Sequence, residues 1–168
     1  MPLTLDTFAA RIRAILQDND APAGREQAAA ALRDALADRA FVESLFDADS
    51  PQRKVVYEDP QLGFCILAHR YTDAKSGPPH DHGPSWAIYG QADGETVMSD
   101  WSPAGDAAPG QPRPVRKLRE YTLSPGSAHV YNEGDIHAPH RAGPTRLIRI
   151  EGCNLEHVQR GTYLAVQE

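Results

Sequence analysis

Apolar residues recur at two different spacings along this chain, and the spacing changes near residue 50. The run from Arg25 to Phe46 is rich in strong helix formers and predicts a helix with a break near Arg39. An earlier amphipathic helix, whose first turn Thr4 or Asp6 can cap, is predicted by apolar residues three or four positions apart: Leu5, Phe8, Ile12, Ile15 and Leu16. We expect these helices to pack on the outside of the main body.

From Pro51 onward the apolar pattern shortens to runs of four to nine residues that are rich in Val, Ile, Tyr, Phe and Thr. So many short strands without interleaved helices predict an antiparallel sandwich or small barrel, with the jelly roll as the natural candidate. Residues 102–114 are rich in Pro, Gly and Ala and are expected to form a mobile connection between two hairpins. The eight predicted strands are RKVVYED, FCILAHRY, SWAIYG, ETVMSDW, VRKLREYTL, SAHVYN, TRLIRIEG and GTYLAVQ.

Composition changes at the same place as the apolar spacing. Residues 1–50 hold 1 Gly and 2 Pro of the 13 Gly and 14 Pro in the chain. We therefore divide the chain into a helical segment, 1–50, that packs on a β-barrel, 51–168, within one structural domain.

Charge and apolar content narrow the class of protein. A net charge of -6 disfavours a nucleic-acid or anionic-membrane partner and leaves a small molecule as the expected one. The chain has no apolar run long enough to cross a membrane, and its start lacks the unbroken apolar core of a secretory signal, so we expect a cytoplasmic protein. Cys65 and Cys153 lie far apart, which argues against a disulfide scaffold and a thiolate zinc site.

The strongest local signal is the sequence GPPHDHG. In an extended segment, His80 and His82 project from the same side and Asp81 from the other, because side chains alternate along a strand. The neighbouring prolines and Gly83-Pro84 stiffen the backbone on both sides. Such rigid placement suits two imidazoles that share one metal ion.

A third ligand is expected from the segment SPGSAHVYNEGDIHAPHRAG. We choose His137, because the turn at 134–135 leads directly into a short strand, and keep His140 and His129 as reserves. Three neutral imidazoles with open positions suit Fe(II), Zn(II), Ni(II), Cu(II) or Mn(II), since affinity alone does not separate these ions. His69 and His157 are interpreted, like His129, as ordinary polar or packing residues.

The two motifs together, GPPHDHGPSWAIYGQADGETVMSDW and SPGSAHVYNEGDIHAPH, resemble those of the cupin superfamily, and within it the cysteine dioxygenase group. The resemblance covers residues 52–152 and implies a double-stranded β-helix with metal ligands at His80, His82 and His137. The glutamate that many cupins add after the pair is missing here, so a three-histidine iron site of the thiol dioxygenase type is implied. The helical N-terminal part is also similar to that group.

The sequence departs from this group at the substrate end. Ala87 and Glu151 occupy the positions of the crosslinked cysteine and tyrosine, Arg149 replaces a supporting histidine, and the substrate-binding arginine has no clear counterpart near VVYEDPQLG. These departures indicate that the metal ligands match those of the group, whereas the residues around the substrate differ.

The alternation of side chains along the strand TRLIRIEG suggests which residues lie at the substrate end of the site. In TRLIRIEG, Leu147, Arg149 and Glu151 share one face, and if that face looks into the barrel, Arg149 lies near the metal. A buried guanidinium must be paired, either by Glu151 or by an anionic substrate; the alternative is an ordinary surface pair. Hydrogen bonds to substrate or dioxygen are assigned to Tyr89 or Tyr131. The cavity walls are assigned to Trp86 and Trp101.

These features favour a mononuclear non-haem Fe(II) dioxygenase acting on a small thiol acid or related organic acid, with dioxygen as the second reactant. Two alternatives stay open. One is a metal-dependent isomerase or lyase that uses the ion as a Lewis acid, and the other is a small-ligand-binding protein without turnover. Serine hydrolase, P-loop and Rossmann motifs are absent from the sequence.

Overall fold

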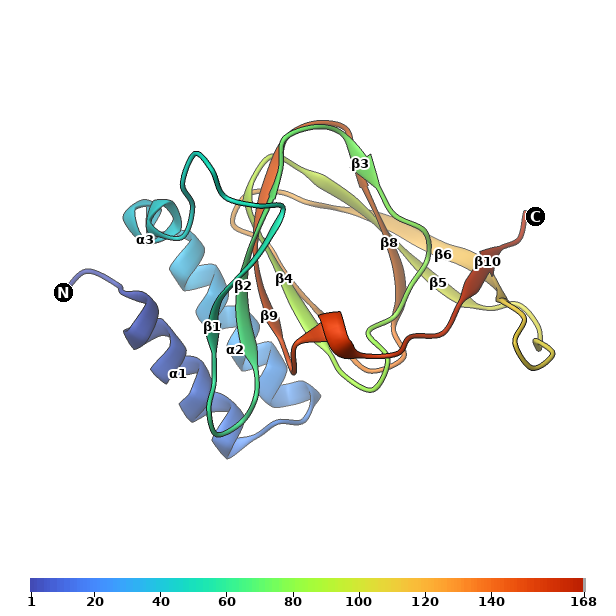
Figure 1. The fold of residues 1–168 in the computed structure, drawn as a ribbon, viewed down its shortest axis with the longest axis horizontal. Helices are drawn as coiled ribbons and strands as arrows, with labels where there is room; N and C mark the ends of the chain where they lie inside the picture. The colour runs from blue at the N-terminus through green and yellow to red at the C-terminus, as the bar shows by residue number, and fades with distance from the viewer. Residues whose placement is uncertain (168) are drawn as a thin grey trace.

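Two five-stranded sheets curl toward each other and form the body of the molecule (Figure 1). The computed structural model describes residues 1–167. One sheet has the order β1-β2-β9-β4-β7 and the other β10-β6-β5-β8-β3. The strands are β1 Arg53–Glu58, β2 Cys65–Tyr71, β3 Lys75–Ser76, β4 Ala87–Asp93, β5 Thr96–Pro103, β6 Arg113–Leu123, β7 Ala128–Tyr131, β8 Ile136–Arg141, β9 Thr145–Glu151 and β10 Tyr163–Ala165.

Three helices precede the strands: α1 Leu5–Asp18, α2 Pro22–Leu36 and α3 Arg39–Ser44. Thr4 caps α1 through a reciprocal pair of hydrogen bonds with Thr7, as the sequence suggested. Asp38 accepts a hydrogen bond from the Phe41 amide and starts α3, which explains the predicted break near Arg39. A short 3-10 helix, η1, covers Leu155–His157.

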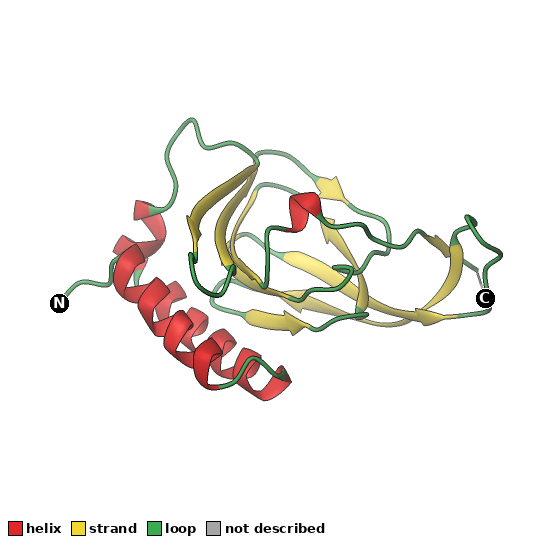
Figure 2. Ribbon diagram, turned by 60° about the horizontal axis from the view of Figure 1, so that its bottom comes forward, coloured by secondary structure: helices red, strands yellow, loops and turns green. Residues whose placement is uncertain are grey.

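The helices lie on the outer face of the β1-β2-β9-β4-β7 sheet (Figure 2). Apolar residues of α1 and α2 form one buried cluster with the outward side chains of that sheet, including Ile66, Ile88 and Ile148. Each fully buried side chain of this size contributes about 1.5–3 kcal/mol. Gly90 permits the close approach of α2, because a Cβ there would lie 2.7 Å from Leu32 Cδ2 and 2.9 Å from the Ile148 carbonyl oxygen.

The opposite face of the same sheet points into the barrel. Leu147 belongs to an interior cluster with Tyr89, Tyr131 and Met98, whereas Ile148 and Ile150 face the helices. The predicted fold class is therefore confirmed: a mainly β double-stranded β-helix with a helical segment at its N-terminus. The barrel interior receives the alternate residues of β2, β4, β7 and β9.

Four details differ from the sequence-based expectation. Residues 104–112 are the loop of a single hairpin, because β5 and β6 pair from Thr96↔Leu123 to Pro103↔Val115, so the prediction of a connection between two hairpins was wrong. The two-residue strand β3 was missed, and β10 runs parallel to β6 in otherwise antiparallel sheets. His80 and His82 lie in a loop in which only His80 makes an isolated bridge.

No helix in residues 1–167 combines the length and the apolar character needed to cross a membrane.

Candidate metal centre

Three histidines from two distant segments meet inside the barrel. His80 and His137 are joined by reciprocal backbone hydrogen bonds of 2.9 Å, and His82 follows two residues later. One ring nitrogen from each histidine lies within 4.8 Å of the others. The structure therefore brings together the two motif histidines and the one chosen from the GDIHAPH segment, and this group can hold a metal ion.

Backbone carbonyls orient two of the rings. Nδ1 of His80 lies 3.0 Å from the Pro78 carbonyl oxygen, and Nδ1 of His137 lies 2.9 Å from the carbonyl oxygen of Asp135. A carbonyl can only accept, so each Nδ1 carries the proton and each Nε2 is left with a free lone pair. Asp81 points away, and its carboxylate accepts hydrogen bonds from the Gly83 amide and the Tyr163 hydroxyl.

All three imidazoles are neutral at pH 7. Burial lowers the pKa of His80 to about 4 and that of His82 to about 2, and burial lowers the pKa of His137 well below its usual value. Neutral nitrogens with free lone pairs are the form that binds a divalent transition metal. The donor set thus fits such an ion.

Tyr89 touches two of the three histidines. Its hydroxyl lies 2.9 Å from Nε2 of His82 and 3.3 Å from Nε2 of His137, and the residue is fully buried. Tyr131 is placed differently, because its ring stacks on His137 at 4.0 Å between centroids while its hydroxyl lies 2.7 Å from that of Tyr121. The Tyr89 hydroxyl is therefore at the ligand nitrogens, and the Tyr131 hydroxyl is in a separate network.

Arg149 also faces the interior, as its parity with Leu147 predicted. Its guanidinium carbon lies 4.0 Å from the centroid of the Tyr89 ring, and its buried Nε has no hydrogen-bond partner among residues 1–167. Glu151 does not supply the partner considered from the sequence. Its carboxylate accepts hydrogen bonds from Arg53, at 3.1 Å, and from the Leu155 amide, at 3.3 Å.

Ala87 and Glu151 lie directly opposite each other in the β4–β9 pairing. These are the positions that the sequence comparison matched to a crosslinked cysteine and tyrosine. A methyl group and a carboxylate cannot form a thioether bond, so this pair leaves no crosslink at the site.

A cavity of about 250 Å³ opens beside His80 and Arg149. Arg141 lines it too, although the sequence analysis did not single this residue out. Parity is the signal that could have found Arg141, because it lies four residues after His137 on the same strand and so on the same face. The other lining residues are Tyr71, Lys75, Ser76, Gly77, Pro78, Pro139 and Arg160.

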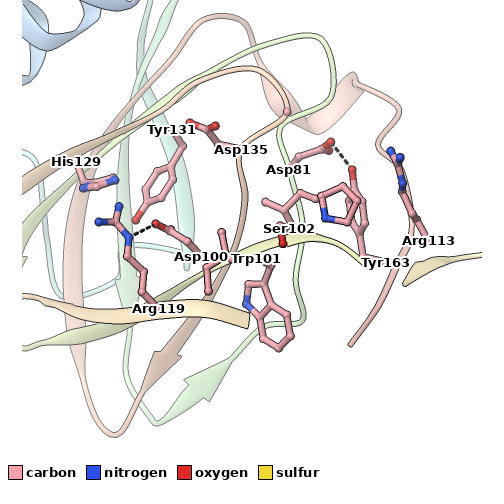
Figure 3. A pocket seen from close by; sticks show the side chains of 14 residues that line it. Asp81, Asp100, Trp101, Ser102, Arg113, Arg119, His129, Tyr131, Asp135 and Tyr163 are labelled. Carbon is pink, nitrogen blue, oxygen red and sulfur yellow. Dashed lines mark hydrogen bonds and ion pairs between the residues drawn. The ribbon is translucent and has the colours of Figure 1, made fainter. Parts of the chain in front are cut away.

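A larger cavity, of about 500 Å³, opens on another side of the triad and includes Asp81, Tyr131 and Asp135 (Figure 3). Arg119 contacts Asp100 at 2.7 Å in this cavity, and the Tyr163 hydroxyl donates to Asp81. Three aspartates and two arginines, Arg113 and Arg119, line this cavity, so its lining has no excess of positive charge.

The remaining histidines lie outside the metal group. His129 stacks on Tyr121, and His140 is exposed with Nδ1 2.6 Å from the Ser76 hydroxyl. His157 is exposed in η1. His69, interpreted from the sequence as an ordinary polar or packing residue, is buried with Nδ1 3.3 Å from the Tyr71 hydroxyl.

The two tryptophans do not share the role expected for them. Trp86 packs in the cluster between the sheet and the helices, with Arg25 at 5.2 Å over its ring, so its assignment to the cavity wall was wrong. Trp101 lines the larger cavity. The error has a simple cause: Trp86 and Ile88 share the outward face of the sheet.

No family model matches the chain, and no curated protein matches it in sequence. Similar solved structures include a cupin superfamily protein from Desulfitobacterium hafniense, with 18% identity over 64% of this chain and 83% of that one and a TM-score of 0.43. A double-stranded β-helix protein from Klebsiella pneumoniae has 13% identity over 73% and 88% of the two chains and a TM-score of 0.49. An oxalate oxidase in complex with the substrate analogue glycolate has 16% identity over 64% and 55%, with a TM-score of 0.43.

Proposed function

We propose that this chain is a mononuclear non-haem Fe(II) dioxygenase that acts on a small thiol acid. One observation carries the proposal: three neutral imidazoles converge beside the half-buried Arg149, whose buried Nε has no hydrogen-bond partner and whose guanidinium has no carboxylate partner among residues 1–167. A metal site alone would suit many reactions. A metal site next to an unpaired cation favours a substrate that brings its own negative charge.

Each residue has a distinct task in this proposal. His80, His82 and His137 would hold the ion, His80 and His137 through Nε2, because backbone carbonyls fix their rings through Nδ1. Bound Fe(II) supplies the redox chemistry by which dioxygen is reduced and a thiolate, RS⁻, becomes a sulfinate, RSO₂⁻, with both oxygen atoms transferred to sulfur. Arg149 binds the substrate carboxylate and thereby orients the thiolate toward the histidines.

Tyr89 is the group best placed to hold a proton near the reacting atoms. Burial raises the pKa of its hydroxyl, so the phenol stays protonated and can donate a hydrogen bond. The guanidinium of Arg149 also lies over the face of the Tyr89 ring, and this cation–π contact fixes the position of Arg149 relative to the histidines. The Tyr131 ring stacks on the ring of His137. Glu151, at the end of β9, forms an ion pair with Arg53 of β1.

Oxygen uptake tests the proposal. The purified chain is reconstituted with Fe(II) without oxygen and then assayed with oxygen over a panel of thiol acids, with Zn(II)-loaded protein as the control. We expect stoichiometric uptake of one dioxygen per thiol acid with Fe(II) only. Turnover of a sugar or keto acid without oxygen would instead support the isomerase or lyase alternative, and binding without any turnover would support a ligand-binding protein.

A further inference from the structure

The cavity beside His80 carries more positive charge than one carboxylate can neutralise. Four cationic side chains line it and none of its lining residues is acidic: Lys75, Arg141, Arg149 and Arg160. Two of these cations lie over the ring of Tyr71, with the Arg141 guanidinium carbon at 4.3 Å and the Lys75 Nζ at 5.9 Å from the ring centroid. The larger cavity contrasts with this one, because three aspartates line it beside two arginines.

Arg141 is a second arginine of this cavity that has no carboxylate partner among residues 1–167. The residue is only 2% exposed, and neither its Nε nor its Nη2 has a hydrogen-bond partner among residues 1–167. Leaving such donors unpaired in a low-dielectric interior is costly. Arg141 comes from β8 and Arg149 from β9, so two strands independently bring an unpaired cation to the same cavity.

Within residues 1–167 no carboxylate forms an ion pair with Arg141 or Arg149. Glu151, the buried acid on β9, is bound by Arg53. A carboxylate meets one guanidinium through two parallel hydrogen bonds, which uses both of its oxygens on a single arginine. An organic acid with one anionic group would therefore leave either Arg141 or Arg149 unpaired.

We propose that the ligand of this cavity is a small organic acid with two anionic groups, one bound by Arg149 and the other by Arg141. This inference rests on the proposed function for the thiol, and it names the substrate class as thiol dicarboxylic acids or their close analogues. A cavity of about 250 Å³ lies below the roughly 300–1,000 Å³ of typical drug-sized sites, so both groups belong to one short carbon chain.

Succinate and butyrate test the inference, because they have the same four-carbon chain and differ by one carboxylate. Binding of each to the full chain is measured by titration calorimetry, with and without Fe(II) under anaerobic conditions. We expect succinate to bind at least about tenfold more tightly than butyrate, as a charged hydrogen-bonded pair provides. Arg141→Met should remove this preference by weakening succinate alone, while Arg141→Lys should keep part of it.

Arg116→Met is the matched control, because it removes the same charge from an exposed position on β6 and should leave both affinities unchanged. Melting curves check that each variant is folded. Equal affinities, no binding of succinate, or a preference that survives Arg141→Met would overturn the inference. Binding of sulfate as tightly as succinate would also overturn it, since one compact group would then satisfy both arginines.

The two proposals fail separately. Oxygen uptake with 3-mercaptopropionate but none with mercaptosuccinate would keep the dioxygenase and overturn the second anionic group. Tight succinate binding that depends on Arg141, without oxygen uptake with any thiol acid, would keep the two-anion site and overturn the dioxygenase.

Discussion

The guanidinium carbon of Arg149 lies 4.0 Å from the centre of the Tyr89 ring. The hydroxyl of the same tyrosine lies 2.9 Å from Nε2 of His82. Tyr89 therefore joins the expected substrate anchor to the metal ligands with one rigid side chain. Its ring and its hydroxyl serve different partners, so the two contributions can be separated by mutation.

Tyr89→Phe keeps the ring and removes only the hydroxyl. Because the ring still supports Arg149, we expect KM to change little, while kcat falls by about 100-fold or more through loss of the hydrogen bond and proton source at the histidines. The metal content should be unchanged. Oxygen-uptake kinetics with a thiol acid and elemental analysis measure these quantities.

Tyr131→Phe is the comparison for that variant. The Tyr131 hydroxyl is bonded to Tyr121 and not to the triad, so its removal should lower kcat by less than about tenfold. If Tyr131→Phe were the more damaging change, the proton source would have to be reassigned to the Tyr121 network.

Removal of any one ligand should release the metal. We expect His80→Ala, His82→Ala and His137→Ala each to lower Fe(II) affinity by more than about 100-fold, since even changes around the ligands cost 10–100-fold. His129→Ala and His140→Ala should retain the metal, because neither residue belongs to the group. Elemental analysis of each purified variant decides the matter; a His137→Ala variant that retained metal would transfer the role to His140 or His129.

The triad could be predicted because its signal is local. Two histidines separated by one residue, and a third after a Gly-Asp turn, are visible without knowledge of the fold. Arg141 and His69 were equally accessible by parity, since each lies an even number of residues from an interior residue of its own strand, but no spacing motif drew attention to them.

Other features require the three-dimensional register. Arg53 on β1 donates a hydrogen bond to Glu151 on β9, 98 residues later in the chain. The two strands are separated in the sheet only by β2, and no pattern within either segment encodes this strand order. The sequence pattern places Trp86 in a predicted strand, on the same face as Ile88. Whether its face points to the barrel or to the helices depends on where α1 and α2 pack, which the sequence pattern leaves open.

Two arginines on β9 should have opposite effects on stability. Arg149→Met removes a half-buried charge whose Nε has no hydrogen-bond partner among residues 1–167, so we expect the free energy of unfolding to rise by roughly 1 kcal/mol while KM for the thiol acid rises about 10–100-fold. Arg146→Met removes ion pairs to Glu43 and Asp93, which connect α3 to the sheet, and should lower the free energy of unfolding by about 1–2 kcal/mol. Urea unfolding of both variants measures the contrast. A clear loss of stability in Arg149→Met would show that Arg149 is a structural residue and not a substrate anchor.

The contact between α1 and the β1–β2 turn should depend on pH through Asp59. Burial acts to raise the pKa of this carboxyl, but hydrogen bonds from two backbone amides, Arg13 and Tyr57 outweigh burial and hold it at about 2. The folded pKa lies below the unfolded value, so the stabilisation is present above about pH 4 and is lost as the pH falls toward 2.

Asp59→Asn should consequently lower the free energy of unfolding at pH 7 by on the order of 2 kcal/mol, and this deficit should shrink to near zero by about pH 2. Asp34→Asn removes an exposed partner of Arg11 and should change stability by less than about 0.5 kcal/mol at either pH. Urea titrations of the two variants and the parent chain between these pH values measure the difference. A deficit in Asp59→Asn that stayed constant with pH would mean that shape, and not the charge of Asp59, holds α1 against the barrel.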